Sequence, residues 1–227
     1  SIFGLDCGRQ ASEIAKDVGY LPSENCYYNS MKVKEMLLYT AELYGVAGHN
    51  RMEALAERLN LDLSRRIGDL SLGNKKKVGI ISALLPSPKL LIMDEPTSGL
   101  DPLIQQTFYD LLKEENERGT TIFLSSHVLS EVQRLCDRVA ILREGKLVGV
   151  QSMKELRGNG YKKISLTAKN AIPEDLFSIS GTANLEWDKS KTSVSFMFSG
   201  TVMTIMNQLH RLELEDILIE EPSLEEI

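Results

Sequence analysis

The stretch Leu90-Leu91-Ile92-Met93-Asp94-Glu95-Pro96 decides the fold class. An apolar run that leads into two carboxylates and a proline is typical of a strand that is buried on both faces and ends in a polar loop. Similar apolar runs follow at 121–124 and 139–142, and a helical stretch separates the first two runs. Because parallel strands need such a crossover, the order predicts an α/β fold with a mainly parallel sheet.

The crossover helix has clear end signals. Asp101 is placed to cap it, and Pro102 occupies its first helical position. Apolar residues at helical spacing are predicted to face the core; they are Ile104, Phe108, Leu111 and Leu112. This helix is therefore expected to cover one face of the sheet.

Residues 25–86 predict a helical block upstream of this sheet. Apolar side chains recur at helical spacing through two segments between residues 32 and 60, the second behind the N-cap candidate Asn50. Between Asn74 and Leu85 the apolar residues lie on nearly every side, which is typical of a helix buried among neighbours. Residues 25–86 are therefore expected to be all-helical.

The pattern changes again near the C-terminus. A Glu144-Gly145 turn predicts a hairpin ending at 146–150, and Gly158-Asn159-Gly160 is interpreted as a linker between domains at 1–157 and 158–227. The second domain is predicted to hold strands near 161–167, 182–187, 192–198 and 214–220, with helices at 173–177 and 201–212. This β-α-β-β-α-β order is the split-βαβ pattern of a small α/β domain.

Composition excludes several classes of protein. The 227 residues carry 26 basic and 32 acidic side chains, and the net charge of −6 argues against a nucleic-acid binder. The longest nearly apolar stretch, Val78 to Leu85, is far shorter than the roughly 18 residues of a membrane-spanning helix. Three widely spaced cysteines indicate neither a disulfide scaffold nor a zinc site, and they fit a reducing cytosol.

Polar motifs lie where an α/β sheet binds ligands. Adjacent side chains on a strand point oppositely, so Asp94 can serve a metal while Glu95 addresses a water. Three further motifs could bring donors to a phosphate: Ser98-Gly99-Leu100-Asp101, Leu70-Ser71-Leu72-Gly73-Asn74 and Ser125-Ser126-His127. Each also has a structural explanation when taken alone, since Ser71 suits a helix cap and His127 suits a strand end.

In this order and spacing the motifs resemble those of the ATP-binding cassette family, the ATPase subunits of ABC transporters. The resemblance covers nearly the whole chain and implies a P-loop NTPase core. It implies that Asp94 holds Mg²⁺ through water, that Glu95 polarises the attacking water and that His127 contacts the γ-phosphate. By this resemblance the helical block at 25–86 is an inserted helical subdomain that would dock on a membrane partner. The C-terminal domain resembles the accessory tail of multidrug or antibiotic exporter subunits.

The resemblance also implies a head-to-tail dimer that sandwiches two ATP. Ser71, Gly73 and Asn74 match the signature motif, which touches the nucleotide bound to the partner subunit, and Asp101 ends the D-loop at the dimer interface. Three lysines follow the signature, at 75–77. Successive helix positions point about 100° apart, so the lysines cannot converge on one phosphate and are interpreted as a solvated helix face.

The sequence departs from the family pattern at several places. The motif Gly-x-x-x-x-Gly-Lys-[Ser/Thr], which holds the β- and γ-phosphates, does not occur in these residues, and the family places it upstream of Ser1. Segment 19–24 resembles the Q-loop, but Ser23 stands in place of the glutamine that contacts Mg²⁺. Leu72 replaces a signature glycine and Asn74 a glutamine.

We expect the chain to be N-terminally truncated and inactive alone. Ser1-Ile2-Phe3-Gly4 is interpreted as a strand already under way. The family places another strand between those at 121–124 and 139–142, so its loss predicts a partly open sheet, strand exchange or aggregation.

The expected function is ATP hydrolysis with Mg²⁺ that energises a separate transmembrane permease, of exporter type, from the cytoplasmic face of the cell membrane. Partners are expected to be a second ATPase subunit and the permease, without nucleic acid. Two alternatives remain at this point. One is a non-catalytic interaction module, with Ser23, Leu72 and Asn74 as signs of a decayed site. The other is an ABC ATPase of translation or DNA repair that works without a membrane subunit.

Overall fold

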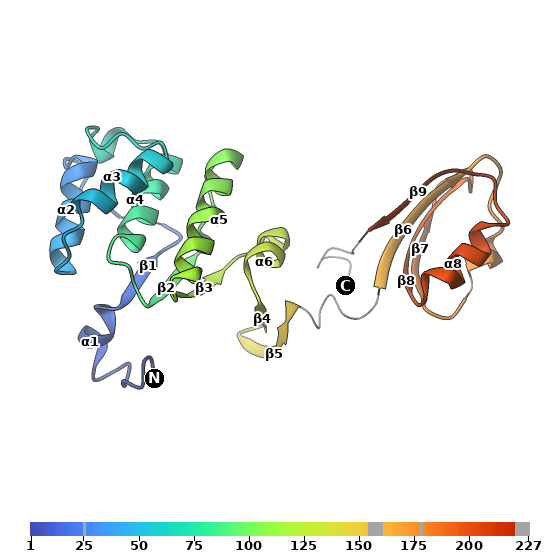
Figure 1. The fold of residues 1–227 in the computed structure, drawn as a ribbon, viewed down its shortest axis with the longest axis horizontal. Helices are drawn as coiled ribbons and strands as arrows, with labels where there is room; N and C mark the ends of the chain where they lie inside the picture. Colours follow the sequence, from blue (N-terminus) through green and yellow to red (C-terminus); the bar gives the residue numbers. More distant parts are fainter. Residues whose placement is uncertain (25, 154–160, 178, 221–227) are drawn as a thin grey trace. The chain divides into compact units, whose positions relative to one another are not determined.

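The computed structural model describes residues 1–24, 26–153, 161–177 and 179–220. Contacts divide the chain into two compact units, residues 1–127 and 128–227 (Figure 1). The predicted domain boundary after residue 157 and the linker Gly158-Asn159-Gly160 lie outside the described residues. The division into domains 1–157 and 158–227 therefore stays a prediction.

A three-stranded parallel sheet lies at the centre of the first unit. Strand β2 (Leu90–Asp94) is flanked by β1 (Val18–Leu21) and β3 (Thr121–Ser125). The register places Leu90 opposite Thr121 and Asp94 opposite Ser125. The parallel sheet predicted from the apolar runs at 90–93 and 121–124 is confirmed, whereas the run at 139–142 lies in a separate antiparallel hairpin. The partly open sheet expected from a truncated chain stays a prediction.

The crossover helix α5 (Pro102–Glu117) forms as its end signals predict. Asp101 Oδ1 accepts hydrogen bonds from the backbone N–H groups of Leu103, at 3.1 Å, and Ile104, at 3.0 Å. All four residues of the predicted apolar stripe are buried. Burial of this stripe fixes the face that α5 turns to the core.

Four helical elements form the block upstream of β2. They are α2 (Val33–Leu43), α3 (His49–Arg58), the 3₁₀ turn η1 (Ile67–Asp69) and α4 (Leu72–Leu84), and they gather together in Figure 1. Helix α3 begins at His49, so Asn50 is not its N-cap and that expectation is wrong. Tyr44 donates a hydrogen bond from its hydroxyl to the Val18 carbonyl, 2.9 Å away, and joins α2 to β1.

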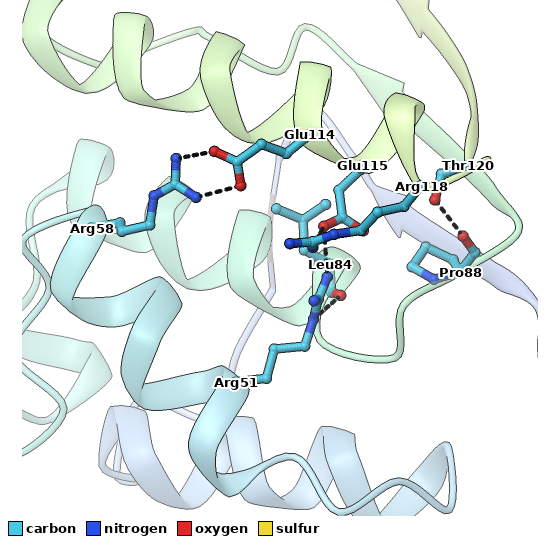
Figure 2. A network of polar contacts seen from close by, with 8 residues as sticks. All are labelled: Arg51, Arg58, Leu84, Pro88, Glu114, Glu115, Arg118 and Thr120. Atoms are coloured by element: carbon cyan, nitrogen blue, oxygen red, sulfur yellow. Dashed lines mark hydrogen bonds and ion pairs between the residues drawn. The ribbon is translucent and has the colours of Figure 1, made fainter.

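Charged side chains tie α3 to α5 (Figure 2). Arg58 binds the exposed Glu114 through two hydrogen bonds of 2.7 and 2.8 Å. Glu115 is only 3% exposed, and its Oε1 lies 2.9 Å from Arg51 Nη2 and 2.5 Å from Arg118 Nη1. The Arg51 Nη2 contact is an ion pair outside hydrogen-bond geometry, while Arg51 Nε donates to the Leu84 carbonyl at 3.1 Å. Arg51 of α3 therefore contacts both the buried carboxylate on α5 and the last residue of α4.

The chain start differs from the expectation. Residues Ser1-Ile2-Phe3-Gly4 are not in a strand, because Ile2 and Leu5 form an isolated bridge with each other. Phe3 and Gly4, with φ of 54° and 79°, make the tight turn between them. The interpretation of this stretch as a strand is therefore wrong. A short helix, α1 (Ala11–Ala15), follows before β1.

The second unit begins with helix α6 (Leu129–Leu135) and an antiparallel hairpin. The hairpin joins β4 (Arg138–Arg143) to β5 (Lys146–Ser152) through Glu144 and Gly145, as predicted. In the described part of the chain no helix combines the length and the apolarity that crossing a bilayer requires.

The remaining elements form an antiparallel sheet in the order β7-β8-β6-β9, with α8 packed on one face (Figure 1). In chain order they are β6 (Tyr161–Ala168), the 3₁₀ turn η2 (Glu174–Phe177), β7 (Thr182–Trp187), β8 (Ser193–Ser199), α8 (Val202–Leu209) and β9 (Leu214–Glu220). Phe177, Phe196 and Ile205 lie in the core beneath the helices. The predicted split-βαβ pattern is confirmed.

Candidate functional site

The acidic doublet lies at the carboxyl end of the central strand β2. Ser125, opposite Asp94 on β3, donates a short hydrogen bond from Oγ to Asp94 Oδ1. Glu95 leaves the strand with φ of 45°, a left-handed conformation that is uncommon outside glycine, and its N–H donates to the Ser125 carbonyl at 3.1 Å. Such backbone conformations persist where the surroundings determine them, often at functional sites. Ser125 thus contacts the Asp94 side chain through its hydroxyl and the Glu95 backbone through its carbonyl.

The Glu95 carboxylate is bound through both of its oxygens by His127, which follows β3. His127 Nδ1 lies 2.7 Å from Glu95 Oε2, and the His127 backbone N–H donates to Glu95 Oε1 at 3.1 Å. The Glu95 side chain is 28% exposed and the His127 side chain 79%. A carboxylate fixed through both oxygens, but still open to solvent, is suited to orient a water molecule and to take up its proton. The two predicted catalytic residues are therefore brought together.

The predicted signature residues lie at the start of α4. Ser71 is the N-cap, and its Oγ accepts a hydrogen bond from the Asn74 N–H at 3.3 Å. The structural explanation of Ser71 as a cap thus holds. A Cβ on Gly73 would lie only 2.6 Å from the carbonyl oxygen of Gly99, so this glycine is needed for the packing of the signature turn against the 98–101 loop.

Gly73→Ala is expected to lower the free energy of unfolding by about 1 kcal/mol. The added methyl overpacks the Gly99 carbonyl, at a typical cost of about 1–3 kcal/mol, and a gain in helix propensity of up to about 1 kcal/mol offsets part of it. Urea unfolding followed by far-UV circular dichroism measures the change. Gly8→Ala is the matched control, because its Cβ would make only an ordinary contact of 3.4 Å. Equal stability of the two variants would contradict this account.

The other predicted ligands have mainly backbone or capping roles. Asp101 uses Oδ1 to cap α5, as described above. Gly19 to Leu21 belong to β1, so the loop that resembles a Q-loop begins at Pro22. Ser23 is exposed in this loop, and its carbonyl oxygen accepts a hydrogen bond from Lys76. The structure thus gives Ser23 a contact through its backbone.

The lysines after the signature turn are not a solvated face, so that interpretation is wrong. Lys76 and Lys77 are only 3% and 8% exposed. Lys76 Nζ donates to the carbonyls of Pro22, at 3.2 Å, and Ser23, at 3.1 Å, while Lys77 Nζ donates to Asn60 O at 3.5 Å. Long side chains bury their stems and carry the ammonium to distant acceptors. The lysines reach different acceptors, so the prediction that they do not converge is confirmed.

A magnesium ion bound together with a nucleotide fits the acidic end of β2. No three His, Cys, Asp or Glu side chains gather into a metal cluster within the residues that the structure describes. Mg²⁺, however, usually takes one or two carboxylates and completes its shell with phosphate oxygens and water. Asp94, held by Ser125 at one oxygen, is such a single carboxylate.

The chain is similar to several known proteins. A family model described as "AAA domain, putative AbiEii toxin, Type IV TA system" matches residues 51–132. The bacitracin transport ATP-binding protein BcrA of Bacillus licheniformis is 36% identical over 74% of this chain and 57% of its own length. The linearmycin resistance ATP-binding protein LnrL of Bacillus subtilis (strain 168) is 28% identical over 100% of this chain and 78% of its own.

A solved structure described as "Structure of ATP binding subunit of ABC transporter" decides the family. Its sequence is 30% identical to this chain, and the two structures superpose with a TM-score of 0.66. The match covers 70% of this chain and 68% of the solved chain. The chain belongs to the ATP-binding subunits of ABC transporters. As an ABC ATP-binding subunit it has the α/β fold that the apolar runs predict, but it spans only 57% of the length of BcrA.

Two residues of this ABC subunit's site were not predicted from the sequence. Ser125 lies in the quoted motif before His127, and aligning the starts of β2 and β3 would have placed it opposite Asp94. Lys76 gave no signal, because helical spacing alone does not show which side of a helix is covered by a distant loop.

Proposed function

We propose that this chain is the ATP-binding and ATP-hydrolysing part of an ABC exporter subunit that energises a separate transmembrane permease. The observation that carries the proposal is the pairing of Glu95 with His127 beside Asp94, at the carboxyl end of a parallel sheet. Open α/β sheets bind ligands at this end. We therefore propose both the transport-coupled ATPase activity and its assignment to Asp94, Glu95 and His127.

Three side chains divide the chemical work. Glu95 accepts the proton of the attacking water, and His127 holds the carboxylate in position from Nδ1 and contacts the γ-phosphate. Asp94, with one carboxylate oxygen fixed by Ser125, would hold the magnesium ion, and Ser23 would offer a further oxygen ligand. Mg²⁺ supplies charge neutralisation on the β- and γ-phosphates when it is bound with ATP.

A second copy of the subunit completes the site in our proposal. The signature turn at Ser71, Gly73 and Asn74 packs against the loop that ends at Asp101, so the two motifs form one continuous surface. Helix N-termini present unpaired N–H groups and a positive dipole end to anions. We infer that this surface faces the nucleotide of the partner subunit in a head-to-tail dimer.

The permease partner and the exporter class are supported by the similar proteins. BcrA is named for bacitracin transport and LnrL for linearmycin resistance, and both are named as ATP-binding proteins. We propose that the chain works at the cytoplasmic face of the membrane without nucleic acid, and that residues 158–227 are an accessory domain. The intact Glu95–His127 pair disfavours a decayed interaction module.

The test uses the complete product of the gene, because residues 1–227 contain no Gly-x-x-x-x-Gly-Lys-[Ser/Thr] loop and are expected to be inactive alone. Phosphate release from ATP is measured with Mg²⁺ and after chelation with EDTA, and the oligomeric state with and without ATP. We expect Mg²⁺-dependent hydrolysis and an ATP-dependent dimer. A dimer without hydrolysis would support the non-catalytic module, and absence of both would overturn the proposal.

A further inference from the structure

Lys76 connects two parts of the molecule that are distant in sequence. It lies on α4, is 3% exposed, and donates from Nζ to the carbonyl oxygens of Pro22 and Ser23 at 3.2 and 3.1 Å. These carbonyls belong to the loop that follows β1. The lysine therefore fixes the start of this loop on a helix more than fifty residues away.

A second bond ties the same loop to the same helix. The Tyr27 hydroxyl donates to the Lys75 carbonyl at 3.4 Å, next to Lys76 in α4. Helix α4 begins with the signature turn, whose Gly73 packs on the Gly99 carbonyl four residues beyond Glu95. The first turns of α4 thus contact Pro22, Ser23 and Tyr27 as well as the segment that follows the acidic doublet.

The lysine occupies this place at a cost. Burial lowers the pKa of Lys76, and the charges of Asp94 and Glu95 oppose this shift only in part. Burial of an ammonium is unfavourable, and a methionine of similar length would fill the space without that penalty. A residue that is less favourable for stability than an apolar one of the same size often has a functional role.

We propose that Lys76 is a positioning residue that clamps the Pro22 and Ser23 carbonyls to α4 and so holds the Ser23 loop beside the acidic doublet. This inference rests on the proposed function, because it concerns the same site. Since α4 carries both the clamp and the signature turn, a shift of this helix would displace the loop and the turn together. Loss of the clamp misplaces the loop during hydrolysis.

The first measurement needs no nucleotide. Glu24 is exposed in the clamped loop, so a glutamyl-specific protease can cleave after it once the loop opens. We expect cleavage of Lys76→Met at this bond to be about tenfold faster than in the unchanged chain, because cleavage follows the population of the open loop. Lys75→Met is the matched control, since its neighbouring ammonium makes neither of the two carbonyl contacts.

The second measurement separates positioning from stability. In the complete gene product, Lys76→Met is expected to lower kcat about tenfold and to leave the KM for ATP within about twofold, because misplacing a loop slows the chemical step. Its thermal midpoint is expected to be no lower than that of Lys75→Met. Lys76→Arg, which keeps donors for both carbonyls, restores part of kcat.

Three results overturn the proposal. The first is loop cleavage as slow as in the control, and the second is unchanged kcat despite a loosened loop. A fall in thermal midpoint that parallels the fall in kcat would also overturn it, because this is the signature of a purely structural lysine. If Lys76→Met fails to fold, Tyr27→Phe removes the second tie, and cleavage no faster than in the control then counts against the clamp. Lack of hydrolysis in the unchanged protein overturns the proposed function alone, since loop cleavage is measured without ATP.

Discussion

Glu95→Gln is expected to lower ATP turnover by about 10²-fold or more while ATP binding is preserved. Glutamine has the shape of glutamate and keeps an acceptor for the His127 N–H, which lies 3.1 Å from Glu95 Oε1. It cannot take up a proton from water. The complete gene product is compared with the variant by steady-state phosphate release and by equilibrium binding of a fluorescent ATP analogue.

Glu114→Gln is the matched control for this experiment. Glu114 is a glutamate on the exposed side of α5, bound to Arg58 and distant from the acidic doublet in sequence. Turnover of this control is expected to stay within about twofold of the unchanged protein, since exposed ion pairs contribute little. Undiminished hydrolysis in Glu95→Gln would remove Glu95 from the mechanism, and lost ATP binding would show that the variant disturbs the whole site.

Glu115→Ala is expected to lower the free energy of unfolding of the first unit by about 3 kcal/mol, the lower end of the range for breaking a buried ion pair. Glu115 is 3% exposed and lies between two arginines, so its removal leaves Arg51 and Arg118 without their shared carboxylate (Figure 2). Urea unfolding is followed by pulsed hydrogen exchange of peptides from α5. The single tryptophan, Trp187, lies in the second unit, so its fluorescence does not report this change.

The neighbouring glutamate provides the control. Glu114→Ala breaks an exposed pair with Arg58, also from α3, and is expected to cost about 0.2–1 kcal/mol, less at high salt. A double-mutant cycle of Glu115→Ala with Arg51→Ala isolates the coupling between the buried partners. Equal losses of unfolding free energy in Glu114→Ala and Glu115→Ala would show that burial does not determine the strength of these ion pairs.

Much of the fold could be predicted because local signals and burial agree. The apolar run before Asp94 became β2, and Asp101 capped α5 as its position indicates. The split-βαβ order of the last strands is also observed. In each case a periodic apolar pattern is bounded by a residue with a defined capping or turn preference, so pattern and backbone preference favour one structure.

The predictions failed where tertiary contacts, and not local sequence signals, determine the structure. Strand β1 was not predicted because it has four residues and contains Gly19, where a Cβ would lie 2.2 Å from the Ala83 carbonyl. Its glycine serves close packing against α4, which no local pattern indicates. Lys76 was assigned to solvent because charge normally marks an exposed face, and only the tertiary structure supplies the two carbonyls that accept its hydrogen bonds.

The candidate site was predictable in its members but not in its connections. Asp94, Glu95 and His127 were identified from their places at strand ends, and the structure brings Glu95 and His127 into contact. Ser71 and Asp101 proved to hold helix ends through their side-chain oxygens. Residue type and spacing show where polar groups gather, whereas hydrogen-bond partners depend on register and loop conformation.

Helix α5 connects the helical block to the loop that ends at Asp101. It is a rod of 16 residues, about 24 Å long, and α3 grips its last turns through Arg51 and Arg58. At its other end Asp101 caps the helix and ends the 98–101 loop. The signature turn packs against this loop at Gly99. Because α5 is held at both ends, we expect a shift of α3 to move the loop that ends at Asp101 as well.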